Sequence, residues 1–230
     1  MTHRTNISYY ISRLAVSVML LMATATAVHG QKIFRMEKDS IPLFCGFAVS
    51  FDLVGPAQLL LGDHGEYEGA LRINLHDKWF PVFELGIGRA NHNDDENTHI
   101  TYKTTAPYFR IGMDWNIMKN KHADNRLYAG FRYAFTSYKV DITRDRLIDP
   151  VWGTSSDFGV KDMKCSMHWL EAVFGLDAKI YGPMHLGWMV RYKRRIAHND
   201  GSLGATWYVP GFGTNDNDGF GANFNVIIDI

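Results

Sequence analysis

Ser166 and His168 are the residues of this chain best placed to do chemistry, and only one residue separates them. A histidine within hydrogen-bonding reach can take the proton of a serine, which then attacks an acyl ester as a nucleophile. On a strand the two side chains would share a face about 7 Å apart, so both would have to lean together. No acidic residue can be assigned to orient the histidine. The simpler interpretation is a pair of polar side chains at a boundary with water.

Two long segments, 144–165 and 199–218, contain the residues best suited to binding. They combine glycine, asparagine and aspartate with aromatic side chains, namely Trp152, Phe158, Trp207, Tyr208 and Phe212. Loops on a rigid scaffold often carry function, and such a mixture makes an adaptable surface. Alternatively, the aromatic rings pack against the mouth of the scaffold that holds the loops. Both possibilities stay open at this point.

Metal and cofactor chemistry is not indicated. The acids Asp94-Asp95-Glu96, and Asp216 with Asp218, could offer oxygen ligands to calcium, but neither group has the spacing of a known calcium loop. The ten histidines show no metal-ligand spacing. We therefore predict no metal and no cofactor.

These candidates are carried by segments in which apolar and polar residues alternate with a period of two, as on a strand. In residues 166–180 the odd positions include Glu171 and Asp177, whereas the even positions are mainly apolar. The same alternation predicts eight strands, at 43–53, 66–75, 79–89, 106–116, 126–140, 166–180, 184–196 and 219–230. The connections between them measure about 12, 3, 16, 9, 25, 3 and 22 residues. Alternating short and long connections are typical of an outer-membrane barrel.

The polar faces of these strands carry six acidic and seven basic residues, interspersed with glycine. They are Asp52, Arg72, Glu84, Arg110, Asp114, Arg132, Glu171, Asp177, Lys179, Arg191, Lys193, Arg195 and Asp229. We expect them to form a charge network in the narrow lumen, because eight strands leave an interior that side chains fill. Aromatic residues at strand ends are expected to form two interfacial girdles. The first has Phe44, Trp79, Trp115 and Tyr181, and the second has Tyr67, Tyr138, Trp169 and Tyr192. The alternative is a soluble periplasmic barrel or sandwich with the same alternation turned inside out. Cys45 and Cys165 would lie near opposite ends of such a barrel, as two free thiols.

Residues 1–30 have the pattern of a cleaved signal peptide. Arg4 and Arg13 precede an apolar run that is too short for the roughly 20 residues of a membrane helix, and small residues follow. We expect cleavage after Gly30, or alternatively after Ala27. The predicted domains are then the leader, a periplasmic segment at 31–42 and a barrel at 43–230. The 24 basic and 24 acidic side chains cancel, so no net charge attracts nucleic acid.

Three segments carry a family resemblance: YEGALRINL at 67–75, WYVPGFG at 207–213 and NFNVIIDI at 223–230. The chain resembles an uncharacterised family of small outer-membrane β-barrel proteins of Bacteroidota, with the eight-stranded architecture of OmpA-like and OmpX-like barrels. The resemblance implies an outer-membrane location and a bacterial host, and it implies no activity.

The sequence as a whole predicts an all-β protein, a closed antiparallel eight-stranded up-and-down transmembrane barrel with both termini in the periplasm. The expected partners are outer-membrane lipid, lipopolysaccharide, and the barrel-assembly machinery during insertion. Lys193-Arg194-Arg195 could contact lipopolysaccharide phosphates, but pairing in the lumen with solvation at the rim is the simpler interpretation of these three residues. We expect a monomer with a non-catalytic role, either structural in the envelope or in surface binding. The alternatives are a lipid A-modifying hydrolase that uses Ser166 and His168, and a small selective pore.

Overall fold

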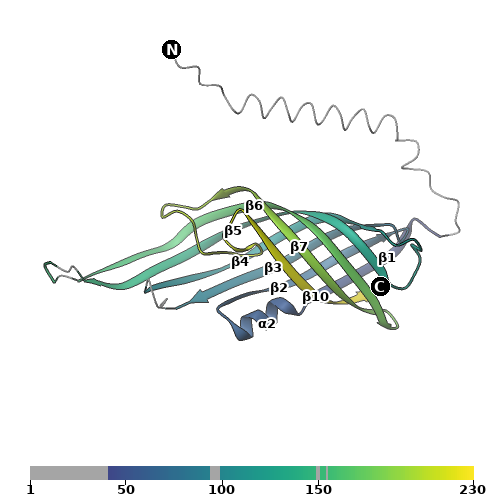
Figure 1. Cartoon of the computed structure of the whole chain (residues 1–230), viewed down its shortest axis with the longest axis horizontal. Helices are drawn as coiled ribbons and strands as arrows, with labels where there is room; N and C mark the ends of the chain where they lie inside the picture. The colour runs from purple at the N-terminus through teal and green to yellow at the C-terminus, as the bar shows by residue number, and fades with distance from the viewer. Residues whose placement is uncertain (1–40, 94–98, 149–150, 154) are drawn as a thin grey trace, which may run out of the picture. The chain divides into compact units, whose positions relative to one another are not determined.

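A computed structural model describes residues 41–93, 99–148, 151–153 and 155–230 of the chain. Eight long antiparallel strands close into a barrel in the order β1-β10-β7-β6-β5-β4-β3-β2, seen from the side in Figure 1. Their bounds are β1 Phe44–Asp52, β2 His64–Leu75, β3 Trp79–His92, β4 Ile100–Asn116, β5 Arg126–Ile148, β6 Ser155–Tyr181, β7 Met184–Asn199 and β10 Asp218–Asp229. The predicted all-β, eight-stranded closed barrel is confirmed.

The alternation in the sequence becomes an alternation between the inside and the outside of this barrel. Along β3 and β4 every second residue is buried, and the residues between them are exposed. The exposed residues are large and apolar, for example Phe83, Leu85, Ile87, Phe109 and Ile111. The buried ones include Glu84, Arg110 and Asp114. The barrel therefore has its apolar side chains outside and its charges inside, the reverse of a soluble domain.

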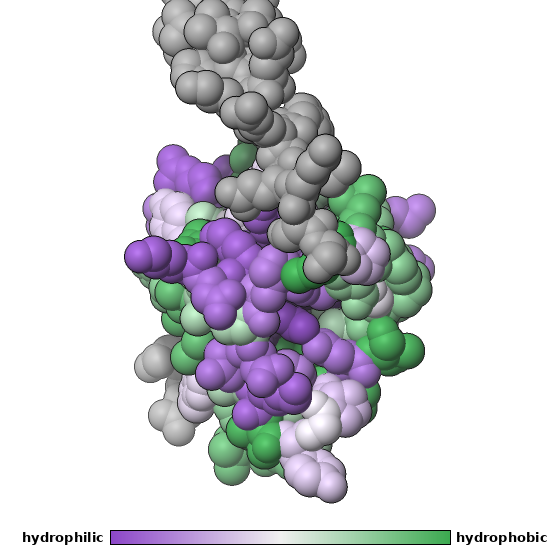
Figure 2. Space-filling view, turned by 90° about the vertical axis from the view of Figure 1, so that its right-hand side faces the viewer, coloured by the Kyte–Doolittle hydropathy of each residue, from purple (hydrophilic) through white to green (hydrophobic). Residues whose placement is uncertain are grey.

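The connections at the two ends of the barrel differ in length. At one end, which we call the turn end, β2 and β3 are joined by residues 76–78 and β6 and β7 by residues 182–183. Figure 2 views this end, where hydrophilic side chains gather in the centre and hydrophobic ones lie at the sides. The turn between β4 and β5, residues 117–125, lies at the same end. The opposite end, the loop end, carries the longest connection, residues 200–217.

The segment 144–165 differs from the prediction, because most of it is strand and not loop. β5 and β6 continue outward as one hairpin that extends beyond the other strands in Figure 1. The register of this pair shifts between Val140 and Ile142 and again between Arg144 and Leu147. Each irregularity puts successive side chains out of the period of two, so the pattern that identifies a strand is lost there although pairing continues.

A short helix, α2 (Val54–Leu61), directly follows β1 and was not predicted from the sequence. In Figure 1 it lies beside β2. Its first turn is held by the Asp52 carboxylate, which accepts the backbone N–H groups of Val54 at 3.3 Å and Gly55 at 2.8 Å. Among the described residues, no helix is long and apolar enough to span a membrane.

The expected second aromatic girdle is only partly present. Tyr67 and Tyr192 are exposed on the outside, whereas Tyr138 and Trp169 are buried inside the barrel. On β6, Trp169 lies two residues before the inward-facing Glu171, and on β5, Tyr138 lies six residues after the inward-facing Arg132. Both aromatic residues therefore lie on the inward face of their strand. The predicted signal peptide (1–30), the segment 31–40 and the acids Asp94-Asp95-Glu96 lie outside the described residues.

Candidate functional site

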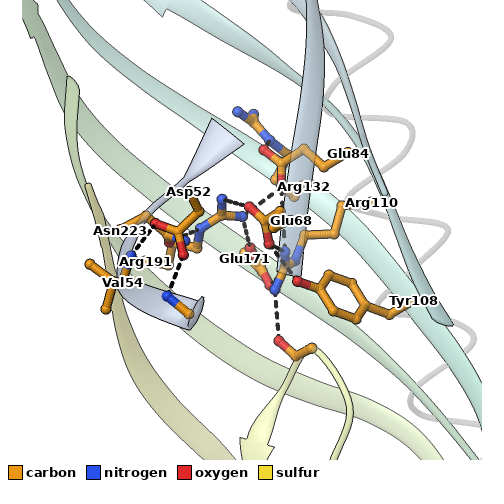
Figure 3. A network of polar contacts seen from close by, with 12 residues as sticks. Asp52, Val54, Glu68, Glu84, Tyr108, Arg110, Arg132, Glu171, Arg191 and Asn223 are labelled. Atoms are coloured by element: carbon orange, nitrogen blue, oxygen red, sulfur yellow. Dashed lines mark hydrogen bonds and ion pairs between the residues drawn. The ribbon is translucent and has the colours of Figure 1, made fainter. Parts of the chain in front are cut away.

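The centre of the barrel holds three glutamates and three arginines that alternate in space (Figure 3). Arg191 of β7 lies between all three acids. Its guanidinium is 2.6 Å from Glu68, 2.6 Å from Glu84 and 3.1 Å from Glu171, and its Nε donates to Asn223 at 2.8 Å. A buried charge has to be paired to offset its lost hydration, and here every acid meets more than one base.

Arg110 and Arg132 complete this cluster. Arg110 of β4 pairs with Glu68 and, at 2.8 Å, with Glu171. Arg132 of β5 is 2.9 Å from Glu84 and makes a two-pronged contact with Asp114, at 2.7 and 2.9 Å. Such bidentate arginine–carboxylate pairs fix geometry as well as charge.

A second layer lies toward the turn end. Arg72 pairs with Asp177 and stacks over the ring of Tyr128, with its guanidinium carbon 4.6 Å from the ring centre. Beyond it, Arg126 contacts both carboxylate oxygens of Asp229, at 3.1 and 2.6 Å. A polar cavity of about 430 Å³ opens at this end, and Cys45, Arg72, Arg126, Lys179 and Asp229 are among the residues that line it.

Three residues assigned to the lumen network from the sequence do not take part in its ion pairs. Lys179 is at the turn end and pairs with Asp124 at 2.7 Å. Arg195 lies at the loop end, where it donates to Asn215 and Asn217. Asp52 is buried, but its partners are the backbone groups of α2 and the N–H of Phe224 at 3.1 Å. Polar residues near the ends of a strand alternate in the same way as those in its middle. The alternation alone therefore could not distinguish residues at the barrel ends from residues of the central charge network.

Glu68 is the central residue that the sequence interpretation missed. It is buried and contacts Arg110, Arg191 and the hydroxyl of Tyr108, which donates to it at 2.7 Å. Its signal was available in the sequence, because Glu68 shares the inward parity of Arg72 on the same strand.

The connection between β7 and β10 folds back into the barrel. Two short strands, β8 (Tyr208–Val209) and β9 (Gly213–Thr214), pair with each other, and we call residues 206–214 the inner hairpin. Arg110 donates to the carbonyl of Gly211 at 2.7 Å, and Lys193 donates to the carbonyls of Gly211 and Phe212 at 2.8 and 3.0 Å. Two lumen cations thus hold the inner hairpin across the loop end.

The five aromatic candidates divide into two groups. Tyr208 and Phe212 are buried in the inner hairpin, where the ring of Phe212 meets Trp169 edge-on. Trp152 and Phe158 are exposed on the β5–β6 hairpin, and Trp207 is exposed at the rim of the barrel. Packing of the mouth is therefore correct for the first group. Trp207 also packs there, because its ring meets those of His64 and Tyr102, while part of its surface stays exposed.

The Ser166 and His168 side chains both lie on the outer face of β6, alternating with buried Met167 and Trp169. The Nδ1 of His168 is 2.8 Å from the hydroxyl of Tyr133, and the imidazole stacks on Phe135. Within the described part of the chain, no hydrogen bond joins Ser166 to His168. The geometry does not provide a histidine base for this serine.

The model of one protein family, described as "Domain of unknown function (DUF6048)", matches residues 8–229. The chain belongs to this family. The match covers every strand of the barrel of this DUF6048 protein. No match was found among functionally curated proteins.

Solved structures similar to this DUF6048 protein include two bacterial surface proteins. One is Ail, the attachment invasion locus protein of Yersinia pestis, solved with the heparin analogue sucrose octasulfate, at 11% identity and a TM-score of 0.37 over 80% of this chain and 93% of that one. The other is Neisserial surface protein A (NspA), at 12% identity and a TM-score of 0.40 over 81% and 99%.

Outside the lumen, this DUF6048 protein has ordinary surface electrostatics. Lys179 donates to Asp124 in the turn at 117–125 and lowers the pKa of that carboxyl. On the β5–β6 hairpin, Lys139 lowers the pKa of Asp162 in the same way.

Cys45 and Cys165 are both free thiols. Among the described residues, no group of three or more histidine, cysteine or acidic side chains is arranged to hold a metal ion.

Proposed function

We propose that this protein is a bacterial outer-membrane barrel with a closed lumen, and that it acts without catalysis through structure or binding at its loop end. One observation carries the proposal: a closed barrel has large apolar side chains around its outside and paired charges within. A hydrocarbon environment requires that arrangement, because closure leaves no unpaired strand edge and lipid solvates apolar side chains.

A closed lumen is supported by two independent obstructions. The arginine–glutamate cluster crosses the centre of the barrel, and the inner hairpin crosses the loop end above it. A small pore needs a continuous water path, and these side chains occupy the section through which it would pass. We therefore expect no stable conductance in planar bilayers, and a reproducible open channel would contradict a closed lumen.

Binding at the cell surface is supported by the β5–β6 hairpin. β7 pairs with β6 only from Ser166 onward, so residues 155–165 of β6 have no strand on that side in the described part of the chain. An unpaired edge can add a strand from a partner, and Trp152 and Phe158 are exposed nearby. We infer that this hairpin, with Trp207 at the rim, makes the contacts to partners outside the cell.

Among Lys193, Arg194 and Arg195, the candidates for a contact with lipopolysaccharide, we infer that Arg194 makes it. Lys193 is buried against the inner hairpin and Arg195 bonds loop asparagines, so Arg194 is the exposed cation on the outside. Arg194 already pairs with Asp218 at 3.0 Å. Arg194 is the residue of the three that could meet a lipid phosphate.

The experiment for the location is fractionation of cells that make the full chain, followed by electrophoresis before and after boiling. We expect the protein in the outer-membrane fraction, with a different mobility in the unboiled sample because the closed barrel stays compact. Recovery in the soluble periplasm with no mobility shift would contradict the proposal.

The experiment for orientation is protease treatment of intact cells. We expect cleavage within residues 141–162 of the hairpin and protection of the turn at 117–125. A variant that joins Val140 directly to Met163 through Asn-Gly retains the paired lower strands, so it should keep the mobility shift and lose this cleavage. Cleavage at 117–125 in intact cells would reverse the proposed orientation.

A further inference from the structure

The wall of the barrel is incomplete at one place near the loop end. β1 ends at Asp52, and its pairs reach only Gly69 of β2 and Asn225 of β10. Beyond that level, residues 64–68 of β2 and 218–223 of β10 face each other across the position that a longer β1 would fill. We call this space the lateral gap. One backbone hydrogen bond, from Leu53 to Phe224 at 2.9 Å, closes its lower edge.

Helix α2 covers only the β2 side of the lateral gap. A side chain on Gly55 would lie 2.1 Å from the carbonyl oxygen of Glu66, and one on Gly65 would lie 2.7 Å from the backbone of Leu59. The two backbones are therefore in direct contact. Above Phe224, no backbone hydrogen bond joins α2 or β2 to β10 among the residues that the structure describes. The opening thus lies between α2 and β10.

A polar cavity of about 330 Å³ lies on the inner side of the lateral gap. Glu66, Lys193, Thr214 and Asp216 are among its lining residues. Lys193 is buried and donates to two carbonyls of the inner hairpin. Glu66 points into the barrel with the parity of Glu68, and no hydrogen bond or ion pair reaches its carboxylate from the described residues. The cavity therefore presents one cation, Lys193, and three carboxylates. Asp218 is paired with Arg194 and Asp216 accepts the backbone N–H of Asn217, which leaves Glu66 as the carboxylate that receives no hydrogen bond or ion pair from the described residues.

An apolar groove of about 620 Å³ lies on the outer side of the same gap. It is lined by Leu53, Val54, Ala57, Leu61, Trp188 and Phe224, together with Gln58, Gly62 and His64. The rings of Trp188 and Phe224 form its floor, 4.5 Å apart. Gln58 and His64 line both the groove and the polar cavity, so the two spaces meet at the lateral gap.

We propose that the lateral gap binds one zwitterionic aminophospholipid, with its head group in the polar cavity and an acyl chain in the groove. Lys193 faces the phosphate and Glu66 accepts from the ammonium, so each charge of the head group meets an opposite charge. The apolar groove takes the chain because it is continuous with the outer surface of the barrel. This inference rests on the proposed function, since the ligand comes from the surrounding membrane.

The test is native mass spectrometry of the full chain after reconstitution in vesicles of equal parts phosphatidylethanolamine and phosphatidylglycerol. We expect one retained lipid per barrel, with phosphatidylethanolamine favoured by about tenfold or more, the effect of one charged hydrogen bond. Glu66→Gln should remove most of that preference. Ala57→Trp, which fills the groove, should remove the retained lipid.

The matched control is Ala172→Trp, because Ala172 is an exposed alanine on the outer face of β6, a strand that contributes no residue to the groove. It should retain lipid as the unaltered protein does. Every variant is also tested for the mobility shift on boiling. Shifted barrels that retain no lipid, or both lipids equally, overturn this inference and leave the proposed function intact. Retention that is unchanged in both Glu66→Gln and Ala57→Trp also overturns it. A chain that neither inserts nor shifts overturns both.

Discussion

Arg191→Met is the sharpest test of how the barrel interior is held together. Arg191 touches Glu68, Glu84 and Glu171 at once. Methionine keeps an unbranched apolar stem of similar length and removes the guanidinium. The substitution therefore tests the charge of the cluster with little change in packing.

The size of the effect follows from the partners that remain. Without Arg191, Glu68 and Glu171 still pair with Arg110, and Glu84 still pairs with Arg132. The cluster thus loses compensation for one buried charge and not for three. Removing one partner of a buried pair costs ~3–5 kcal/mol of unfolding free energy, and we expect a value in that range.

The assay is urea unfolding of the reconstituted barrel, extrapolated to zero denaturant. The control is Arg194→Met, three residues along the same strand, where the pair with Asp218 is exposed and is expected to contribute ~0–1 kcal/mol. Adding Glu68→Gln to Arg191→Met restores the charge balance, so the double variant should recover part of the loss. A loss for Arg191→Met no larger than that for Arg194→Met would refute the reasoning that the cluster stabilises the barrel.

Three further predictions concern the inner hairpin, the outer face and the turn end. Gly211→Ala should cost ~1–3 kcal/mol more than Gly204→Ala in the same urea assay, since both glycines have positive φ but only the first would press a Cβ into a ring, 2.5 Å away. His168→Ala should leave the acyl pattern of lipid A unchanged in mass spectra; an altered pattern would revive the hydrolase. Lys179→Met should raise the pKa of Asp124 toward its ordinary value, measured by NMR titration. The stabilisation from that pair is present above the pKa that Asp124 has in the unfolded chain. It is lost as the pH falls through the lower pKa that Asp124 has in the folded protein, so the variant should not show this loss of stability at acid pH.

The strands could be predicted from the sequence because membrane-type barrels impose a strict rule on every residue. Glu84 and Arg110 lie opposite each other on neighbouring strands, and each has apolar neighbours along its own strand. The same rule would have found Glu68. It also explains why Ser166 and His168 were correctly expected on one face, although their separation along a strand gives no information about the hydrogen bond to Tyr133.

The inner hairpin could not be predicted in the same way. Its position depends on contacts such as that between Arg110 and Gly211, which are 101 residues apart in sequence. The segment that contains Tyr208 and Phe212 has the composition of a surface loop. Donors that are distant in sequence, including the two lumen cations and the hydroxyl of Tyr102, make burial of its carbonyls favourable. The outer part of the β5–β6 hairpin was not predicted for a different reason. Its register shifts break the period of two on which strand prediction depends.

Asp52 links two events in the assembly of the barrel. Its carboxylate accepts the first N–H groups of α2 and also the N–H of Phe224 on β10. One carboxylate therefore connects the first strand, the start of α2 and the last strand, beside the lateral gap. Loss of the Asp52 side chain would remove hydrogen bonds from the helix and from the seam between β1 and β10 at the same time.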